Sequence, residues 1–125
     1  MPTQEAVMTT QDIANRLQEL FTQNKWMEAQ EELFSEDAKS IEPPGAQGLQ
    51  SVEGLDKIRE KGEQFQNMIE EVHGGYTSEP IVAGNFIAFG MGMDVSLKGK
   101  GRMKMDEVAV YEVKDGKIVR EQFFF

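Results

Sequence analysis

Cysteine is absent from this chain of 125 residues, and histidine occurs once. Without cysteine there is no disulfide framework, no thiolate nucleophile and no cysteine-ligated zinc. The single histidine, His73, has no histidine or carboxylate partner at HxxxH or HxxE spacing. We therefore expect neither a metal site nor a bound cofactor.

Positive charge and long apolar runs are also scarce. Thirteen Lys and Arg residues face 22 Asp and Glu residues, which gives a net charge of −9 and a pI near 4.6. Such an acidic surface disfavours nucleic acid and anionic membranes as partners. No apolar run approaches the ~20 residues that a membrane-spanning helix needs. Residues 1–12 lack the basic and apolar regions of a secretory signal, so we expect a cytoplasmic protein.

The length and composition suit one soluble globular domain. Hydrophobic residues make up 39% of the chain and charged residues 28%. We expect a single domain over residues 1–125, in which residues 1–8 form a disordered tail.

Three amphipathic helices are predicted in the first part of the chain. The first begins at Thr9 or Thr10, because Thr9 and Asp12 have the spacing of a capping box. Its apolar face and that of a short second helix follow helical spacing: Ile13, Leu17, Leu20 and Phe21, then Trp26, Ala29, Leu33 and Phe34. The third helix is predicted over residues 52–72.

The segment Leu33–Pro43 joins the second helix to the remainder of the chain. We expect Ser35-Glu36-Asp37 to form a polar turn and Ala38–Glu42 to form a short strand. Pro43 and Pro44 then exclude regular structure. Glu42 is thus the last strand residue before the prolines.

After His73 the apolar period changes to two, which is typical of strands. Strands are predicted over Tyr76–Val82, Phe86–Leu97, Arg102–Val113 and Ile118–Phe125, joined by Gly-containing turns. One side of the third of these strands carries Met103, Met105, Glu107, Ala109, Tyr111 and Val113. Helices followed by a meander of strands predict an α+β fold. The helices pack on a curved, mostly antiparallel sheet to form a cone-shaped roll, whose interior suits an apolar or amphipathic small molecule.

Four short motifs appear in an order that resembles a known superfamily. They are the first helix over Ile13–Phe21, Leu33–Ala38 with its "LF-x-x-D-A" pattern, Val52–Ile58 with "x-x-G-x-x-x-I", and Asp115–Arg120 at the last hairpin. This arrangement is similar to the nuclear transport factor 2-like superfamily, and within it to the SnoaL-like and ketosteroid isomerase-like proteins. The resemblance covers nearly the whole chain.

The resemblance implies roles for two carboxylates. Glu42 matches the general base of the isomerases, which follows the "LF-x-x-D-A" turn and precedes a proline. Their protonated oxyanion-hole acid corresponds to Glu107, or to Asp106 if the strand contains a bulge. Their oxyanion-hole tyrosine has no counterpart, because its place falls near Leu17 or Gln18.

Further residues are candidates for the wall of the pocket. Glu121 and His73 are alternative acid–base groups, since each has an ionisable side chain close to the expected interior. The remaining candidates for substrate contact are Trp26, Met91, Met93, Met103, Met105 and Phe123. The methionines can equally be adaptable core residues.

Two classes of function therefore remain open from the sequence. One is a small-molecule-binding SnoaL-like protein that acts as a cofactor-free isomerase or cyclase, with Glu42 as general base. The other is a non-catalytic ligand-binding or dimerisation module. A homodimer is expected through the sheet face that carries Val108, Val110, Ile118 and Phe124.

Overall fold

The computed structural model describes residues 7–44, 46 and 49–125. Of the predicted tail 1–8, residues 1–6 lie outside the described residues. Met8 is partly buried and packs against the hydrophobic core just before the first helix.

The described residues form three helices, as the sequence predicts. They are α1 (Thr10–Thr22), α2 (Trp26–Leu33) and α3 (Leu55–Met68). The predicted capping box at α1 is confirmed: the Asp12 backbone N–H donates to Thr9 Oγ1, and the Thr9 backbone N–H donates to Asp12 Oδ2, each at 3.0 Å. These bonds satisfy donors that a helix N-terminus otherwise leaves unpaired.

The strands form one sheet that is mostly antiparallel. They are β1 (Phe34–Ile41), β2 (Val52–Glu53), β3 (Ile69–Thr77), β4 (Ile81–Ala83), β5 (Phe86–Leu97), β6 (Gly101–Lys114) and β7 (Lys117–Phe124). Their order is β2-β1-β7-β6-β5-β3, with β4 also paired to β5. Only β1 and β7 pair in parallel within the described strands.

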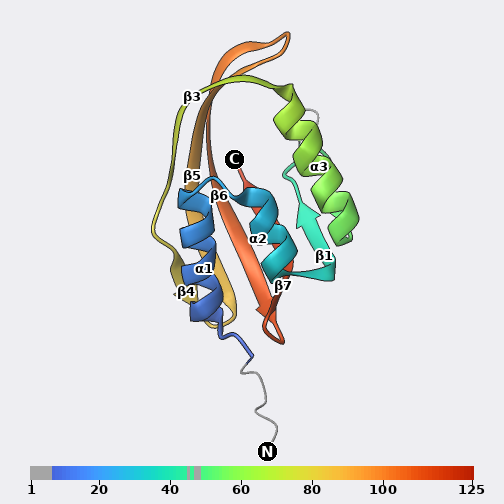
Figure 1. Cartoon of the computed structure of the whole chain (residues 1–125), viewed down its shortest axis with the longest axis vertical. Helices are drawn as coiled ribbons and strands as arrows, with labels where there is room; N and C mark the ends of the chain where they lie inside the picture. Colours follow the sequence, from blue (N-terminus) through green and yellow to red (C-terminus); the bar gives the residue numbers. More distant parts are fainter. Residues whose placement is uncertain (1–6, 45, 47–48) are drawn as a thin grey trace, which may run out of the picture.

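The helices cover one face of the curved sheet (Figure 1). Between the two layers lies the hydrophobic core, which includes Leu17 and Phe21 of α1, Leu33 of α2, and Phe89 and Tyr111 of the sheet. The α+β class and the helix-covered curved sheet expected from the sequence are confirmed. None of the three helices in the described part of the chain covers the opposite face of the sheet (Figure 1).

The boundaries at both ends of α3 differ from the prediction over residues 52–72. Residues 52–53 pair with β1, and the helix begins after Gly54, whose φ of +100° favours glycine. The helix ends at Met68, because Ile69 already pairs with Leu97 of β5. Cross-strand pairing outweighs the helical spacing of Ile69 and Val72, which are β-branched residues with good strand propensity.

Two other local predictions were wrong. Ser35-Glu36-Asp37 is part of β1, not a turn, because β1 begins at Phe34 beside Ile118 and passes through an irregularity before Lys39. The expected strand Tyr76–Val82 is divided between the last residues of β3 and the first residues of β4, and Pro80 lies between the two strands.

Candidate functional site

Glu42 lies directly after β1, and its side chain is only 6% exposed. Its backbone N–H donates to Ser51 Oγ at 2.9 Å, which ties the end of the strand to the chain that returns toward β2. Burial raises the pKa of the Glu42 carboxyl above its ordinary value, and the positive charge of Lys61 partly opposes this shift. Glu42 is thus a buried carboxyl at the edge of the core.

Lys61 extends from α3 toward this carboxyl. Its Nζ donates to Ser40 Oγ at 2.6 Å and lies 3.8 Å from Glu42 Oε2. The same Nζ lies 5.7 Å from the centre of the Phe123 ring, within the range of a cation–π interaction. The ammonium is therefore held by contacts to β1 and β7 as well as by its own helix.

Glu121 of β7 occupies the position beside Ser40 in the parallel β1–β7 pair. The Ser40 hydroxyl donates to Glu121 Oε2 at 2.8 Å, and both residues are buried. Burial raises the pKa of Glu121 to about 7, while the Ser40 hydrogen bond and the charge of Lys61 act in the opposite direction. Glu121 therefore gains or loses its proton near neutral pH.

Glu107 of β6 faces the same side of the sheet as the buried residues Ala109 and Tyr111. The β5–β6 register runs without a shift through Met91↔Glu107, so no bulge reverses the strand. Asp106 points to the opposite face, where it accepts a hydrogen bond from the Tyr76 hydroxyl at 2.7 Å. Burial, followed by the negative charge of Glu42, raises the pKa of Glu107 to about 7.

We refer to Ser40, Glu42, Lys61, Glu107 and Glu121 as the glutamate cluster. It brings three carboxyl groups to one ammonium group in a partly desolvated interior. One ammonium can compensate about one carboxylate, so the other carboxyls favour their protonated forms when buried. An arrangement of this kind places proton donors and a proton acceptor together near pH 7, as acid–base chemistry requires.

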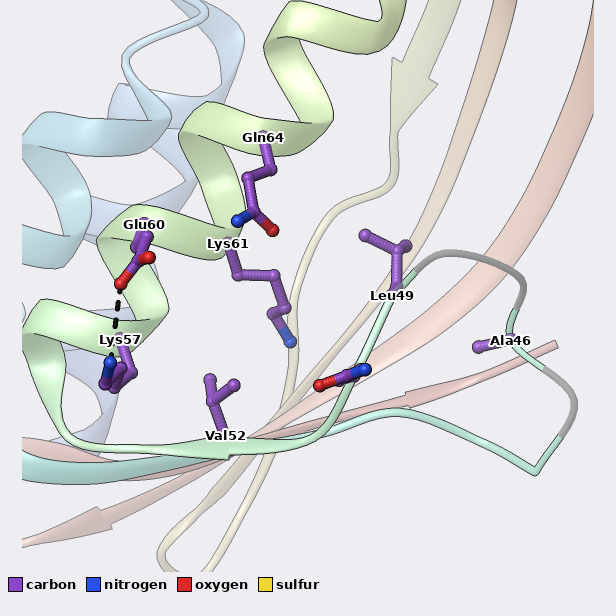
Figure 2. A pocket seen from close by; sticks show the side chains of 8 residues that line it. Ala46, Leu49, Val52, Lys57, Glu60, Lys61 and Gln64 are labelled. Carbon is purple, nitrogen blue, oxygen red and sulfur yellow. Dashed lines mark ion pairs between the residues drawn. The ribbon is translucent and has the colours of Figure 1, made fainter.

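A groove of about 470 Å³ opens beside the cluster. It lies between α3 and the chain that leads into β2 (Figure 2), and it is lined by Ala46, Leu49, Gln50, Val52, Lys57, Glu60, Lys61 and Gln64. Figure 2 shows Lys61 extending from α3 across the groove toward the segment of Leu49 and Val52. Lys61 is the member of the cluster that also lines this groove.

The structure places the other predicted contact residues at different depths. Met91 is buried on β5, Met93 and Met105 are half-buried, and Met103 is 39% exposed near the start of β6. Phe123 is half-buried beneath Lys61. None of these residues is among those that line the groove. Their contact with a ligand remains a prediction.

Trp26 and His73 make contacts with residues outside the glutamate cluster. Trp26 stacks on Phe21, with ring centres 4.2 Å apart, and so joins the aromatic part of the core. His73 is on β3 rather than at a helix end, and its Nε2 lies 2.7 Å from Ser96 Oγ. Ser96 is on the side of β5 opposite to the buried Val95 and Leu97, so His73 contacts the outer face of the sheet.

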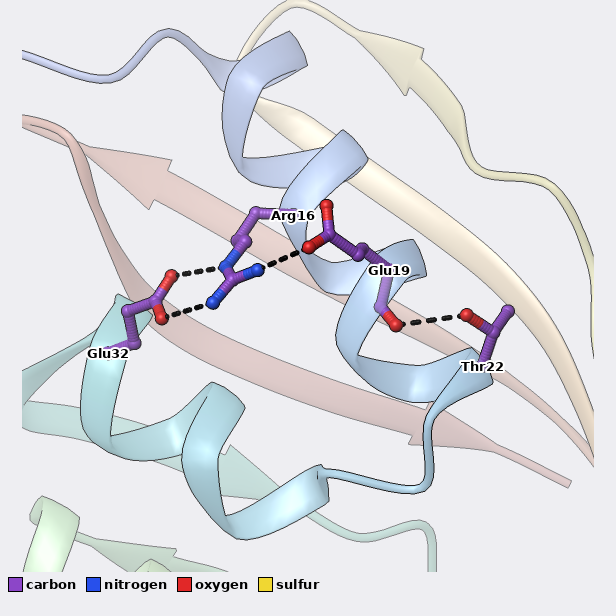
Figure 3. A network of polar contacts seen from close by, with 4 residues as sticks. All are labelled: Arg16, Glu19, Thr22 and Glu32. Atoms are coloured by element: carbon purple, nitrogen blue, oxygen red, sulfur yellow. Dashed lines mark hydrogen bonds and ion pairs between the residues drawn. The ribbon is translucent and has the colours of Figure 1, made fainter.

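A second polar network connects α1 to α2 at the surface. The Arg16 guanidinium binds both carboxylate oxygens of Glu32, at 2.6 and 2.8 Å, and Glu19 at 2.6 Å (Figure 3). Lys117 donates to the backbone carbonyl of Glu32 at 3.0 Å. This network is partly exposed and connects the helix pair to the last hairpin, and none of its residues lines the groove.

Lys61 and Ser40 were not identified from the sequence, although both follow detectable patterns. Lys61 falls three residues after Ile58 and four before Phe65, and thus on the apolar stripe of α3. Ser40 lies between Ala38 and Glu42 in the period-two pattern of β1. The sequence signal for Lys61 was thus a charged residue on the apolar stripe of a helix.

Within the described part of the chain, no group of three or more His, Asp or Glu side chains is arranged to hold a metal ion. None of the described helices has both the length and the apolar character needed to cross a membrane.

The helix-covered curved sheet with a polar cluster on its covered side defines a protein of the NTF2-like fold class. The chain belongs to the SnoaL-like domain family, whose model matches residues 8–125. A search of the curated proteins gave no match.

Solved structures support this assignment. A Mesorhizobium loti protein, described as a SnoaL-like polyketide cyclase and also as a carbohydrate phosphatase, is 35% identical; the match covers 94% of this chain and 100% of that one, with a TM-score of 0.87. TerC, co-crystallised with polyporic acid, is 20% identical over 94% of this chain and 92% of its own, with a TM-score of 0.72. A ketosteroid isomerase-like protein from Catenulispora acidiphila, in complex with trimethylamine, is 19% identical over 94% and 87%, with a TM-score of 0.70. The last two show the shared fold alone.

Proposed function

We propose that this protein binds an apolar or amphipathic small molecule and catalyses a cofactor-free proton transfer of the isomerase or cyclase type. The observation that supports this proposal is the glutamate cluster, in which the buried Glu42 side chain and the half-buried Glu107 lie near one lysine, and the charge of Glu42 raises the pKa of Glu107. Glu42 is the general base, and Glu107 is the protonated hydrogen-bond donor. The assignment of the chain to the SnoaL-like family is consistent with this chemistry.

The proposed step begins with a carbon acid next to a carbonyl group. The Glu42 carboxylate removes the proton, the C–H electron pair becomes a C=C bond, and negative charge develops on the carbonyl oxygen. The protonated Glu107 carboxyl donates a hydrogen bond to that oxygen and stabilises the charge. In a substrate with a neighbouring C=C bond the resulting dienolate takes the proton back from Glu42 at another carbon, as in an isomerisation. Alternatively the enolate carbon attacks a second carbonyl, whose oxygen then takes the proton from Glu42, as in a cyclisation.

The pH dependence follows from the two carboxyls. The step needs Glu42 ionised and Glu107 protonated, so activity decreases as pH rises through about 7, where Glu107 loses its proton. Activity also decreases at lower pH, where Glu42 becomes protonated; its raised pKa moves this limit above the ordinary range. A bell-shaped profile is therefore expected.

The proposal can be tested with benzoylacetone, an aromatic 1,3-diketone with an acidic central C–H bond. Exchange of this proton with D2O is followed by proton NMR at pH 6.5. The wild-type protein should accelerate the exchange, and Glu42→Gln should reduce this acceleration by about 100-fold or more, the usual contribution of a general base. Glu63→Gln, at an exposed position of α3, is the matched control and should exchange like the wild type. Equal rates for the wild type and Glu42→Gln would refute the assignment.

A second candidate function is non-catalytic binding. It is favoured by the position of the groove, which lies beside the cluster and shares only Lys61 with it. The related structures with polyporic acid and trimethylamine are examples of ligand complexes on this fold. Chemical-shift changes at the groove residues on addition of benzoylacetone, without proton exchange, would support this alternative.

A homodimer through the uncovered sheet face is also part of the proposal. This face carries exposed apolar side chains that water would otherwise contact: Tyr76, Ile81, Phe86, Val108 and Phe124. Ile118, which the sequence placed on this face, is fully buried, because the register shift between Glu112 and Val113 turns it toward the core. Analytical ultracentrifugation should show a dimer that Phe124→Glu dissociates, whereas Gln23→Glu, which adds the same charge after α1, should leave it intact. A monomeric wild type would refute the dimer.

A further inference from the structure

The ammonium group of Lys61 lies between two carboxyls that belong to different strands. It contacts Glu42 directly at 3.8 Å, and it reaches Glu121 through Ser40, by hydrogen bonds of 2.6 and 2.8 Å. A distance of 3.8 Å is too long for a hydrogen bond, whereas both steps of the second route are short. Lys61 is therefore connected to Glu121 by hydrogen bonds through Ser40, although its ammonium group also lies near the Glu42 carboxyl.

Ser40 determines this asymmetry. Its hydroxyl is fully buried, accepts from Lys61 and donates its only proton to Glu121. As a result, Glu42 Oε2 is buried without a hydrogen-bond partner among the described residues. A buried carboxylate oxygen without a hydrogen-bond donor is unfavourable. If Lys61 no longer donated to Ser40, its ammonium group would therefore donate to Glu42 instead.

We propose that Lys61 is a positioning residue whose single positive charge is divided between Glu42 and Glu121, and that the Ser40 hydroxyl sets this division. Neither Lys61 nor Ser40 is expected to exchange a proton with the bound molecule. Their role is to determine which of the two carboxyls carries the negative charge of the site. The consequence for catalysis rests on the proposed function, since it concerns the basicity of Glu42.

Other ionisable groups that face the two carboxyls come from β6. Glu107 is half-buried there and Tyr111 is buried, and the charges of Glu42 and Glu107 raise the pKa of Glu121. These groups act on the cluster whether or not Ser40 is present. A change confined to Ser40 therefore isolates the division of the Lys61 charge.

The inference is tested by carbon-13 NMR of protein labelled at the glutamate side-chain carboxyl carbons, with signals assigned through Glu→Gln variants. In Ser40→Ala the hydroxyl bridge is lost and Lys61 is able to approach Glu42. The titration midpoint of Glu121 should then rise and that of Glu42 should fall, each by about one pH unit, the smaller end of the effect of an opposite charge at this range. Shifts of opposite sign are not expected from a merely structural loss.

Three further variants make the result interpretable. Ser51→Ala removes a hydroxyl that accepts from the Glu42 backbone N–H, whereas Lys61 donates to Ser40, so both midpoints should stay as in the wild type. Lys61→Met should raise both midpoints, and Lys61→Arg should restore at least one of them. If Ser40→Ala fails to fold, Ser40→Cys provides the same test, because a thiol of similar size is a weak donor and acceptor.

The inference is overturned if the Glu42 midpoint in Ser40→Ala is unchanged or moves in the same direction as that of Glu121. This titration needs no ligand. It is therefore independent of the benzoylacetone exchange, and a failure of the proposed function can be distinguished from a failure of the charge division. If both hold, Ser40→Ala should also shift the acidic limit of the exchange profile to lower pH.

Discussion

Glu121→Gln should stabilise the folded protein at alkaline pH relative to the wild type. Glu121 is 5% exposed, and burial raises its pKa from the ordinary value of 4.5 to about 7. Between these two values the folded state holds a proton that the unfolded state has released. The folded state is therefore progressively destabilised as pH rises through this range.

The size of the effect follows from the shift. Each pKa unit corresponds to about 1.4 kcal/mol, so ionisation of Glu121 costs the folded state up to about 3 kcal/mol above pH 7, and about 2 kcal/mol of this develops between pH 5 and pH 8. Gln has nearly the same shape and keeps a hydrogen bond to Ser40, but it has no charge to bury. The benefit of the substitution should thus appear at pH 8 and be small at pH 5.

Urea unfolding at pH 5 and pH 8 measures this difference for the wild type, Glu121→Gln and the exposed control Glu63→Gln. The free energy of unfolding of Glu121→Gln should exceed that of the wild type by about 2 kcal/mol more at pH 8 than at pH 5. Glu63→Gln should show no such change with pH. If Glu121→Gln differs from the wild type equally at both pH values, Glu121 does not carry a raised pKa and the description of the cluster is wrong.

Two other predictions concern the fold. Thr9→Ala removes the capping box at the start of α1 and should lower the free energy of unfolding by about 1 kcal/mol in urea titrations; an unchanged midpoint would show that the cap contributes nothing. A side chain at Gly92 would collide with the ring of Tyr76, which lies across it toward Asp106. Gly92→Ala should therefore lower the urea midpoint when Tyr76 is present and do so less in a Tyr76→Ala background, whereas equal effects in both backgrounds would exclude this packing.

Much of the fold could be predicted because its signals are local. The apolar stripe of α1, its capping box and the alternation of β5 and β6 each depend on residues close in sequence. The orientation of Glu107 followed from the same alternation and from the unbroken β5–β6 register. In such segments, local propensity and the final structure agree.

The errors occurred where distant pairing determines the structure. The strand at Ser35–Asp37 depends on β7, which lies about 80 residues further along the chain. The burial of Ile118 depends on a register shift near Glu112, which alternation alone does not reveal. Lys61 was missed for a related reason, because its partners Ser40 and Glu42 belong to a different part of the chain. Its position on the apolar stripe of α3 is unusual for a lysine, but it does not indicate which residues Lys61 contacts.

The central claim is that Glu107 keeps its proton near neutral pH beside the base Glu42. It is tested most directly by the pH titration of the Glu107 carboxyl carbon in the wild-type protein, followed by carbon-13 NMR. A midpoint near 7 is expected, from burial and the neighbouring charge of Glu42, and it should fall in Glu42→Gln, which removes that charge. A midpoint near 4.5, unchanged in Glu42→Gln, would contradict the claim, because Glu107 would then be ionised at neutral pH and unable to donate a proton to a developing oxyanion.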